Sequence, residues 1–119
     1  MNIEPDLCQV EDALGIIVGK WKPIVLLQLL KNGTMRFSEL KREMPEITQK
    51  MLTKQLRELE AEYIVKREVY PQVPPKVEYS ITEYGLTLEP ILNAMHDWGT
   101  NHTMYKQKMN QEKWAEKVQ

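Results

Sequence analysis

The sequence predicts a small α+β fold that is mostly α-helical. Apolar residues recur at helical spacing in several separate segments. Two short segments rich in β-forming residues, divided by a proline-rich stretch, follow in the second half of the chain. The length of 119 residues fits one domain that buries a core without disulfides. The predicted order is two helices, a short strand, two helices, a β-hairpin and a long final helix.

Composition narrows the class of protein. The apolar fraction of 42% is ordinary, and no stretch approaches the roughly 18 consecutive apolar residues of a membrane span. The N-terminal segment is acidic and lacks the apolar centre of a secretory signal, so we expect a cytoplasmic protein with no membrane partner. The single cysteine, Cys8, excludes a disulfide framework within one chain and a multi-cysteine zinc site.

The net charge of −1 is unevenly distributed. Residues 1–19 carry four acidic and no basic side chains, and residues 20–76 carry 12 basic and seven acidic ones. Residues 77–119 carry four basic and six acidic side chains. Charge counts alone favour a chance distribution of charged side chains over a solvated surface. The basic middle segment indicates a function only if its side chains lie on elements suited to binding.

Three helices are predicted in the first half of the chain. Residues 8–18 have apolar side chains at helical spacing, and Gly19 follows as a terminator. Pro23 is a favourable first-turn residue for a second helix that ends at Asn32-Gly33. After a strand stub at Met35-Arg36-Phe37, Ser38 is a natural N-cap for a short third helix that must end at Pro45.

A fourth helix is predicted at roughly Gln49–Glu62, with Thr48 as its cap. Its core face is spaced four, three and four residues apart and stays within about 40° around the axis: Leu52, Leu56, Leu59 and Tyr63. The opposite side carries a basic stripe with a threonine beside it: Lys50, Thr53, Lys54 and Arg57.

The rest of the chain predicts a hairpin and a long helix. Residues 64–70 and 76–81 are the strands, and Pro71–Pro75 forms a stiff loop at the hairpin tip, because proline cannot donate to a ladder. Thr82 is predicted to cap the final helix, whose apolar stripe is Leu88, Ile91, Leu92, Met95 and Trp98. Residues 1–103 form the predicted domain, and residues 104–119 form a polar C-terminal extension for which a helix is one option.

A helix-turn-helix followed by a hairpin indicates duplex DNA recognition. A helix fits the major groove of B-DNA if one face is buried and the opposite face is basic and polar. The helix after Thr48 has that division, although an isolated helix with such a stripe would more simply have a solvated face. The neighbouring short helix and hairpin favour DNA. The candidate contacts are Arg36, Lys41, Arg42, Thr48, Gln49, Lys50, Thr53, Lys54, Arg57, Gln72 and Lys76.

Several segments in a fixed order, covering roughly residues 8–98, carry a family resemblance: Gly19–Lys22, Arg36–Leu40, Ile47–Thr53, Leu56–Glu60, Tyr70–Tyr79 and Leu92–Trp98. With these segments the chain strongly resembles the HxlR-type branch of the MarR-like winged-helix regulators. The resemblance implies a homodimeric transcription regulator, often a repressor, that reads an inverted repeat. It also implies that residues 48–62 enter the major groove, that residues 64–81 form the wing, and that the first and last helices build the dimer.

Two departures from the family pattern matter. The family usually has a glycine where this chain has Tyr63, and tyrosine resists a left-handed conformation, so we expect a reshaped turn there. Family members often carry a cysteine at the position of Cys8, and many use it to sense electrophiles or oxidants. Some join it to a second cysteine of the partner subunit, which this chain lacks.

Cys8 has two interpretations. Its place at the start of a helix favours a reactive thiolate, whereas the nearby carboxylates of Asp6, Glu11 and Asp12 oppose one. A small buried residue in the dimer interface is the alternative. The function therefore includes two options of the same fold, a regulator that responds to oxidants or electrophiles through Cys8 and one that does not.

Other classes of function are weaker. A winged helix can also serve as a protein-interaction module. An enzyme is not expected, because the sequence shows no nucleophile–base constellation and no glycine-rich phosphate loop. No metal or cofactor is expected, because His96 and His102 lack converging ligands. Lys20 and Lys22 fit phosphate contacts and a solvated surface equally well, and Trp21 fits a packing role.

Overall fold

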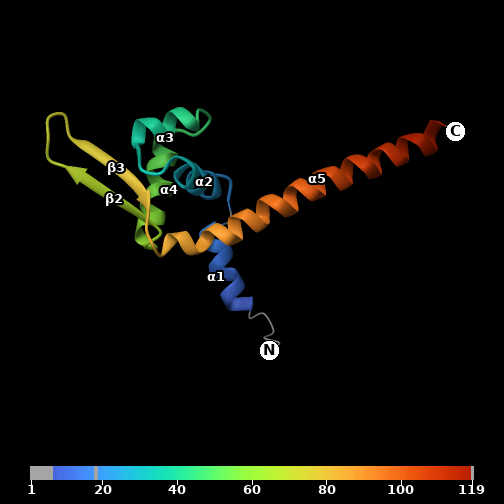
Figure 1. Ribbon diagram of the computed structural model, residues 1–119, viewed down its shortest axis with the longest axis horizontal. Coiled ribbons are helices and arrows are strands. Elements are labelled where there is room, and N and C mark those ends of the chain that lie inside the picture. Colours follow the sequence, from blue (N-terminus) through green and yellow to red (C-terminus); the bar gives the residue numbers. More distant parts are fainter. Residues whose placement is uncertain (1–6, 18, 119) are drawn as a thin grey trace. The chain divides into compact units, whose positions relative to one another are not determined.

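The computed structural model describes residues 7–17 and 19–118. The chain divides after Thr87 into two compact units, Met1–Thr87 and Leu88–Gln119. The mostly helical α+β fold is confirmed, with these elements in chain order (Figure 1): α1 (Leu7–Ile17), α2 (Lys22–Asn32), β1 (Met35–Arg36), α3 (Phe37–Glu43), α4 (Gln49–Ala61), β2 (Val65–Tyr70), β3 (Lys76–Ile81), the 3₁₀ turn η1 (Gly85–Leu88) and α5 (Glu89–Val118).

The core of the first unit is aliphatic. Helices α2, α3 and α4 each bury one side, with side chains that are at most 2% exposed: Val25, Leu26, Leu29, Leu40, Leu52, Leu56 and Leu59. Ile64, just before β2, and Val65, its first residue, add to this core and are each 2% exposed. Burial of this many aliphatic side chains fixes α4 against its neighbours, so its opposite face is presented in a defined orientation.

The ends of the first two helices follow the sequence. Helix α1 ends at Ile17, and Gly19 has a φ of 118°; Val18, predicted as the last helical residue, lies outside the described residues. Helix α2 has Pro23 in its first turn, and Gly33 follows it with a φ of 75°. The Gly33 N–H donates to the Leu29 carbonyl over 2.9 Å, which closes the last turn.

Helix α3 begins earlier than predicted, with its cap two residues before Ser38, so Ser38 is not its cap. The N-cap is Arg36, the last residue of β1, and the Glu39 carboxylate accepts a hydrogen bond from the Arg36 N–H over 2.9 Å. The side chain of Glu39 therefore does the capping that the sequence assigned to Ser38. The helix ends at Glu43, before Pro45, as predicted.

Helix α4 begins as predicted, but the chain beyond it does not follow the prediction. Thr48 Oγ1 accepts a hydrogen bond from the Met51 N–H over 3.1 Å, so Thr48 is the cap. Tyr63 was predicted to lie on the core face, but it is 76% exposed, because the helix already ends at Ala61. The turn is not reshaped either, since Tyr63 adopts a left-handed φ of 64°.

The strands form a three-stranded antiparallel sheet of order β1-β3-β2, which confirms the hairpin. The register places Arg67 opposite Tyr79, and it places Glu78 between Glu68 on one side and Arg36 on the other. Because side chains alternate along a strand, Arg67 and Tyr79 share one face, and the two glutamates lie on the opposite face.

Thr82 caps a different element from the predicted one. Its Oγ1 accepts a hydrogen bond from the Gly85 N–H over 2.9 Å and donates to the Tyr63 carbonyl over 2.6 Å. Thr82 thus caps η1 and ties it to the turn after α4. A Cβ on Gly85 would collide with the Ile64 carbonyl oxygen and lie 2.8 Å from Ile81 Cγ2, so the close approach requires glycine there.

The second unit consists mainly of α5, with Pro90 in its first turn. The helix runs without a break through the predicted boundary after residue 103 to Val118, so the polar extension is helical. Within the predicted apolar stripe Leu92 is 3% exposed, whereas Ile91, Met95 and Trp98 are 44%, 44% and 68% exposed.

No single helix within the described residues is long and apolar enough to cross a membrane, although the bent pair α1–α2 passes that test together by length and composition. In the part of the chain that the structure describes, no group of three or more His, Cys, Asp or Glu side chains could hold a metal ion. His96 lies 3.5 Å from Asp97, and the His102 ring stacks on Trp98 at 4.9 Å.

Candidate nucleic-acid interface

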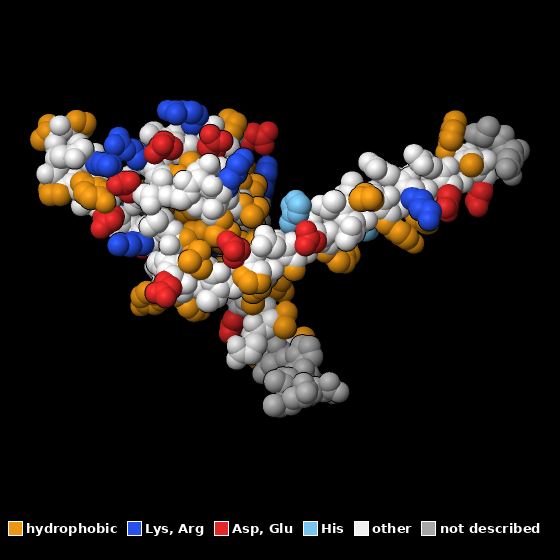
Figure 2. Space-filling model, in the orientation of Figure 1, with side chains coloured by type: hydrophobic (Ala, Val, Ile, Leu, Met, Phe, Trp, Pro, Cys, Tyr) orange, Lys and Arg blue, Asp and Glu red, His pale blue; other side chains and the backbone are white. Residues whose placement is uncertain are grey.

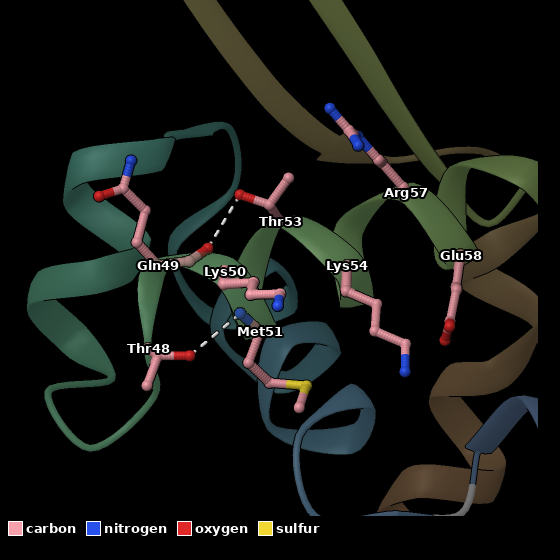
Figure 3. A pocket seen from close by; sticks show the side chains of 8 residues that line it. All are labelled: Thr48, Gln49, Lys50, Met51, Thr53, Lys54, Arg57 and Glu58. Atoms are coloured by element: carbon pink, nitrogen blue, oxygen red, sulfur yellow. Dashed lines mark hydrogen bonds between the residues drawn. The ribbon is translucent and has the colours of Figure 1, made fainter.

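Helix α4 presents a polar and basic surface on the side opposite its buried leucines. Gln49, Lys50, Lys54 and Arg57 are exposed there, and Thr53 is half-buried. A broad, open hollow of about 950 Å³ follows this surface (Figure 3), lined by Thr48, Gln49, Lys50, Met51, Thr53, Lys54, Arg57 and Glu58. The structure therefore brings together all six candidate contacts that the sequence placed in this helix.

The two threonine hydroxyls of this surface are engaged within the helix (Figure 3). Thr48 Oγ1 caps the helix through Met51, and Thr53 Oγ1 donates to the Gln49 carbonyl over 2.9 Å. Thr53 keeps an oxygen that can accept a further hydrogen bond. The amide of Gln49 and the ammonium of Lys50 are the long polar groups near the N-terminus of α4, where a recognition helix meets base edges.

The cations of this surface are not held in close ion pairs with other described residues. Among the described residues, Lys50, Lys54 and Arg57 form no ion pair. The carboxylate of Glu58 is held instead by Lys22 from the start of α2, with 2.8 Å between Nζ and Oε2. This hydrogen bond is the largest influence and lowers the pKa of Glu58. Burial opposes it, and the positive charges of Lys22 and Lys54 add smaller lowering effects.

Lys22 is therefore already paired with a carboxylate. Its side chain is 15% exposed and joins α2 to α4, so the structure favours neither of the roles that the sequence left open for it. The neighbouring Lys20 places its ammonium 4.6 Å from the centre of the Trp21 ring. Trp21 itself is half-buried, in keeping with a packing role.

Helix α3 supplies two further cations. Lys41 Nζ donates to the Pro45 carbonyl over 3.5 Å, and Arg42 is exposed. The preceding residue, Leu40, is fully buried, which fixes the helix on the core. Figure 2 shows that Lys and Arg side chains gather over the α3 and α4 region with acidic side chains interspersed, so the surface is mixed in charge and not uniformly basic.

The wing candidates have unequal access. Gln72 is exposed at the hairpin tip. Lys76 is half-buried, with Nζ 3.4 Å from Glu78 Oε1 and 5.1 Å from the centre of the Tyr70 ring. Arg36 is exposed but pairs across the sheet with Glu78, so both basic candidates lie beside one carboxylate. Of these three candidates, Gln72 at the tip is the one that is exposed and does not lie beside Glu78.

One face of the wing carries two carboxylates together with basic side chains. Tyr70 OH donates to Glu68 Oε2 over 3.1 Å, and this hydrogen bond raises the pKa of Tyr70. The register brings Glu78 directly beside Glu68. Each carboxylate has a lysine beside it, with 3.7 Å between Lys66 Nζ and Glu68 Oε1 and 3.4 Å between Lys76 Nζ and Glu78 Oε1, so this face is mixed in charge.

Sequence reasoning missed a group where α4 meets the hairpin. A small hollow of about 150 Å³ is lined there by Thr53, Leu56, Arg57, Glu60, Arg67 and Tyr79. Arg67 Nε lies 3.4 Å from Glu60 Oε2, and burial raises the pKa of Tyr79. Alternation along each strand was visible in the sequence, but the register that pairs Arg67 with Tyr79 was not.

Cys8 is the second residue of α1 and is exposed. Glu11 and Asp12 of the same helix are also exposed, and Asp6 lies outside the described residues. In a single chain this position is accessible to small reagents, whereas a dimer interface built on α1 would cover it, so the exposure favours neither interpretation of Cys8.

Comparison with known proteins shows the family to which this chain is similar. Residues 16–107 match the family described as HxlR-like helix-turn-helix. The HTH-type transcriptional regulator YdeP of Bacillus subtilis (strain 168) is 52% identical over 112 residues, which are 94% of this chain and 84% of YdeP.

Two solved structures of regulators are similar to this chain in fold and in sequence. The reduced form of the redox regulator HypR has a TM-score of 0.76 at 57% identity, with 80% of this chain and 93% of HypR covered. The reduced form of the transcriptional regulator YodB from B. subtilis has a TM-score of 0.69 at 37% identity, with 76% of this chain and 87% of YodB covered.

Proposed function

Because the chain belongs to the HxlR-like helix-turn-helix family of DNA-binding transcriptional regulators, which are not enzymes, we propose that it is a homodimeric repressor of an inverted-repeat operator. The observation that carries this proposal is the division of α4. Leu52, Leu56 and Leu59 are at most 1% exposed, and the opposite side of the same helix presents exposed cations. A helix held in this way can enter the major groove without losing its orientation.

The proposal assigns different roles along α4. Gln49, Lys50 and Thr53, nearest the N-terminus of the helix, contact base edges. Lys54 and Arg57, together with Lys41 and Arg42 of α3, contact phosphates and set the register without reading sequence, and the Thr48 cap orients helix amides toward one.

The wing adds contacts of lower weight. Gln72 at the exposed tip reaches the neighbouring minor groove, and Lys76 and Arg36 support it from the sheet. Because Lys76 lies 3.4 Å from the Glu78 carboxylate, its net attraction for a phosphate is reduced.

The dimer is proposed to form through α1 and α5. Large apolar side chains of both helices are exposed: Leu7, Val10 and Leu14 in α1, and Met95, Trp98 and Tyr105 in α5. A second copy would cover these side chains. Two-fold symmetry then predicts half-sites about one helical turn, ~10 bp, or a multiple apart. A monomer in sedimentation at micromolar concentration would contradict the dimer.

Within this proposal residues 1–103 bind DNA and dimerise, and residues 104–119 extend α5. We place the regulator in the cytoplasm, where its DNA is. Cys8 is proposed to respond to oxidants or electrophiles, which is supported by its position at the N-terminal end of α1 and by the likeness to HypR, a redox regulator. With one cysteine in the chain, the modified forms are a sulfenic acid, a mixed disulfide with a small thiol, an electrophile adduct or a Cys8–Cys8 bridge between subunits.

The decisive experiment is selection of duplexes from a random pool by the purified protein, followed by binding measurements at several salt concentrations. We expect one inverted repeat to be enriched and its affinity to fall steeply with salt. Gln49→Ala and Lys50→Ala should each lose roughly 1–3 kcal/mol of discrimination, whereas Arg42→Ala should weaken all duplexes alike. Unchanged preference in both α4 variants would refute the recognition assignment.

The sensor role needs its own test. Affinity for the selected duplex is measured before and after a quinone or a peroxide, in the wild-type protein and in Cys8→Ser. We expect a loss in the wild type alone. Equal losses in both proteins, or no loss in either, would remove Cys8 from the mechanism and leave DNA binding intact.

A further inference from the structure

The small hollow between α4 and the hairpin has the composition of an anion site. Two guanidinium groups reach it, Arg57 from the helix and Arg67 from β2, together with the phenol of Tyr79 from β3. Its volume of about 150 Å³ suits a compact group and not a drug-sized molecule.

The charge at this hollow is unbalanced. Glu60 is its only carboxylate among the described lining residues, and it contacts Arg67 through Nε at 3.4 Å. A guanidinium has five N–H donors in a planar fork, so this single contact leaves most of the Arg67 donors available. The Arg67 and Glu60 side chains remain 47% and 37% exposed, which keeps the pair accessible from solvent.

The hollow is continuous with the recognition surface. Thr53 and Arg57 line both it and the larger hollow along α4. Figure 3 shows Arg57 extending toward the strands, whereas Lys54 and Glu58 point to the other side of the helix. A duplex lying on Gln49, Lys50 and Thr53 would therefore pass this junction, where its groove edge presents a backbone phosphate.

We propose that Arg57 and Arg67 form a seat for one DNA backbone phosphate at the junction of α4 and the wing, with Glu60 as the group that holds Arg67 in place before DNA arrives. The inference rests on the proposed DNA binding, in which Arg57 already contacts a phosphate, and adds Arg67 and Glu60 to it. Paired guanidinium donors match the geometry of phosphate oxygens. The carboxylate of Glu60 repels the incoming phosphate, so it lowers the affinity for DNA.

The first test compares Arg67→Gln with Lys66→Gln on the duplex selected by the wild type and on a scrambled duplex of equal length. Lys66 is a matched control, because it is the adjacent cation, is 59% exposed and pairs with Glu68 on the opposite face of the wing. We expect Arg67→Gln to weaken both duplexes alike by about tenfold at 0.1 M salt and to reduce the salt slope by about one. Lys66→Gln should change affinity less than about twofold.

The second test separates the phosphate seat from a merely structural ion pair. If the Arg67–Glu60 contact only braced the wing, Glu60→Gln and Arg67→Gln would weaken binding together. The phosphate seat requires opposite signs: Glu60→Gln tightens binding to both duplexes and keeps the salt slope. Thermal melting verifies that each variant is folded, and Arg67→Lys, which keeps the charge but loses the fork, should recover the slope and only part of the affinity.

Several results would overturn the inference. These are losses of the same sign in the Glu60 and Arg67 variants, equal effects of Arg67→Gln and Lys66→Gln, or an unchanged salt slope in Arg67→Gln. A free anion is tested with inorganic phosphate at constant ionic strength. Stabilisation of the wild type but not of Arg67→Gln, without an effect on DNA binding, would assign the hollow to a soluble ligand instead. Failure of the wild type to select any duplex would refute the proposed function itself.

Discussion

Helices α4 and α5 are held in different ways. Helix α4 has 13 residues and buries three leucines that are at most 1% exposed. Helix α5 has 30 residues, yet none of its side chains described from residue 93 to residue 117 is buried. Short helices are marginal in water without packing, so α4 depends on the core, whereas the greater part of α5 depends on its own backbone hydrogen bonds.

This difference separates two kinds of surface. Because α4 is fixed on one side, its other side can present polar groups at defined positions, as sequence reading requires. Helix α5 instead exposes large apolar side chains, including Trp98, Tyr105 and Trp114 at 60–70%. A helix of that kind is suited to meeting another protein surface, which is why the dimer is proposed there and DNA contact is proposed at α4.

The largest expected effect tests the packing of α4. Leu56→Ala should lower the free energy of unfolding by about 2–5 kcal/mol, because it empties a site that is 1% exposed. Met104→Ala in α5 is the matched control, since Met104 is 62% exposed and should change stability by less than about 0.5 kcal/mol. Urea unfolding of both variants measures the difference. Similar losses would show that α5 is packed as tightly as α4.

The next effect concerns one glycine in each region. Gly85→Ala should destabilise by about 1–3 kcal/mol, because the added Cβ collides with the Ile64 carbonyl oxygen and crowds Ile81. Gly99→Ala in α5 should stabilise by roughly 0.5–1 kcal/mol, because nothing lies within 4 Å and alanine favours a helix. Thermal melting of the two variants at low protein concentration measures whether each is more or less stable than the wild type. Destabilisation by Gly99→Ala would reveal a close contact on α5.

Local sequence signals predicted much of the fold. Pro23, Gly33 and Thr48 marked helix ends because each acts through its own backbone or a neighbouring turn. The leucine spacing of α4 gave its buried face, and with it the six candidate contacts on the other side. Signals of this kind need no knowledge of the rest of the chain.

The wrong or missing predictions concern residues whose roles depend on strand pairing or on contacts with residues distant in the sequence. Thr82 was assigned to the long helix, but its hydroxyl serves η1 and the Tyr63 carbonyl, 19 residues earlier. Ser38 lost the capping role to Glu39, because β1 runs directly into α3. Arg67 was missed because its position opposite Tyr79 follows from strand register, which the sequence of one chain does not specify.

A smaller effect is expected where α4 gives way to the wing. Tyr63→Gly should stabilise the protein by about 0.5 kcal/mol. A left-handed φ of 64° disfavours tyrosine by roughly 1–2 kcal/mol, and the greater freedom of glycine in the unfolded chain offsets part of the gain. Tyr63→Ala is the control, because it removes the 76% exposed ring but keeps a Cβ. Equal stabilisation by both variants would assign the effect to the ring and not to the backbone.

The smallest effect is a pH dependence at the contact between α4 and α2. Lys22 lowers the pKa of Glu58 in the folded protein, so the ion pair contributes fully above the unfolded pKa of about 4.3. That contribution is lost as the pH falls through the lowered pKa. The Glu58 side chain is 41% exposed, so solvent screening limits the contribution to a few tenths of a kcal/mol.

The measurement is the difference in Tm between the wild type and Glu58→Gln, followed from about pH 6 to pH 3. We expect the wild type to be the more stable at pH 6, and the difference to shrink as the pH falls through the lowered pKa of Glu58. Lys22→Met should abolish the same pH-dependent increment, and the double variant should lose no more than either single one. Lys31→Met, at the exposed far end of α2, is the control and should leave the increment intact. An increment that survives Lys22→Met would mean that Glu58 is held by a group other than the start of α2.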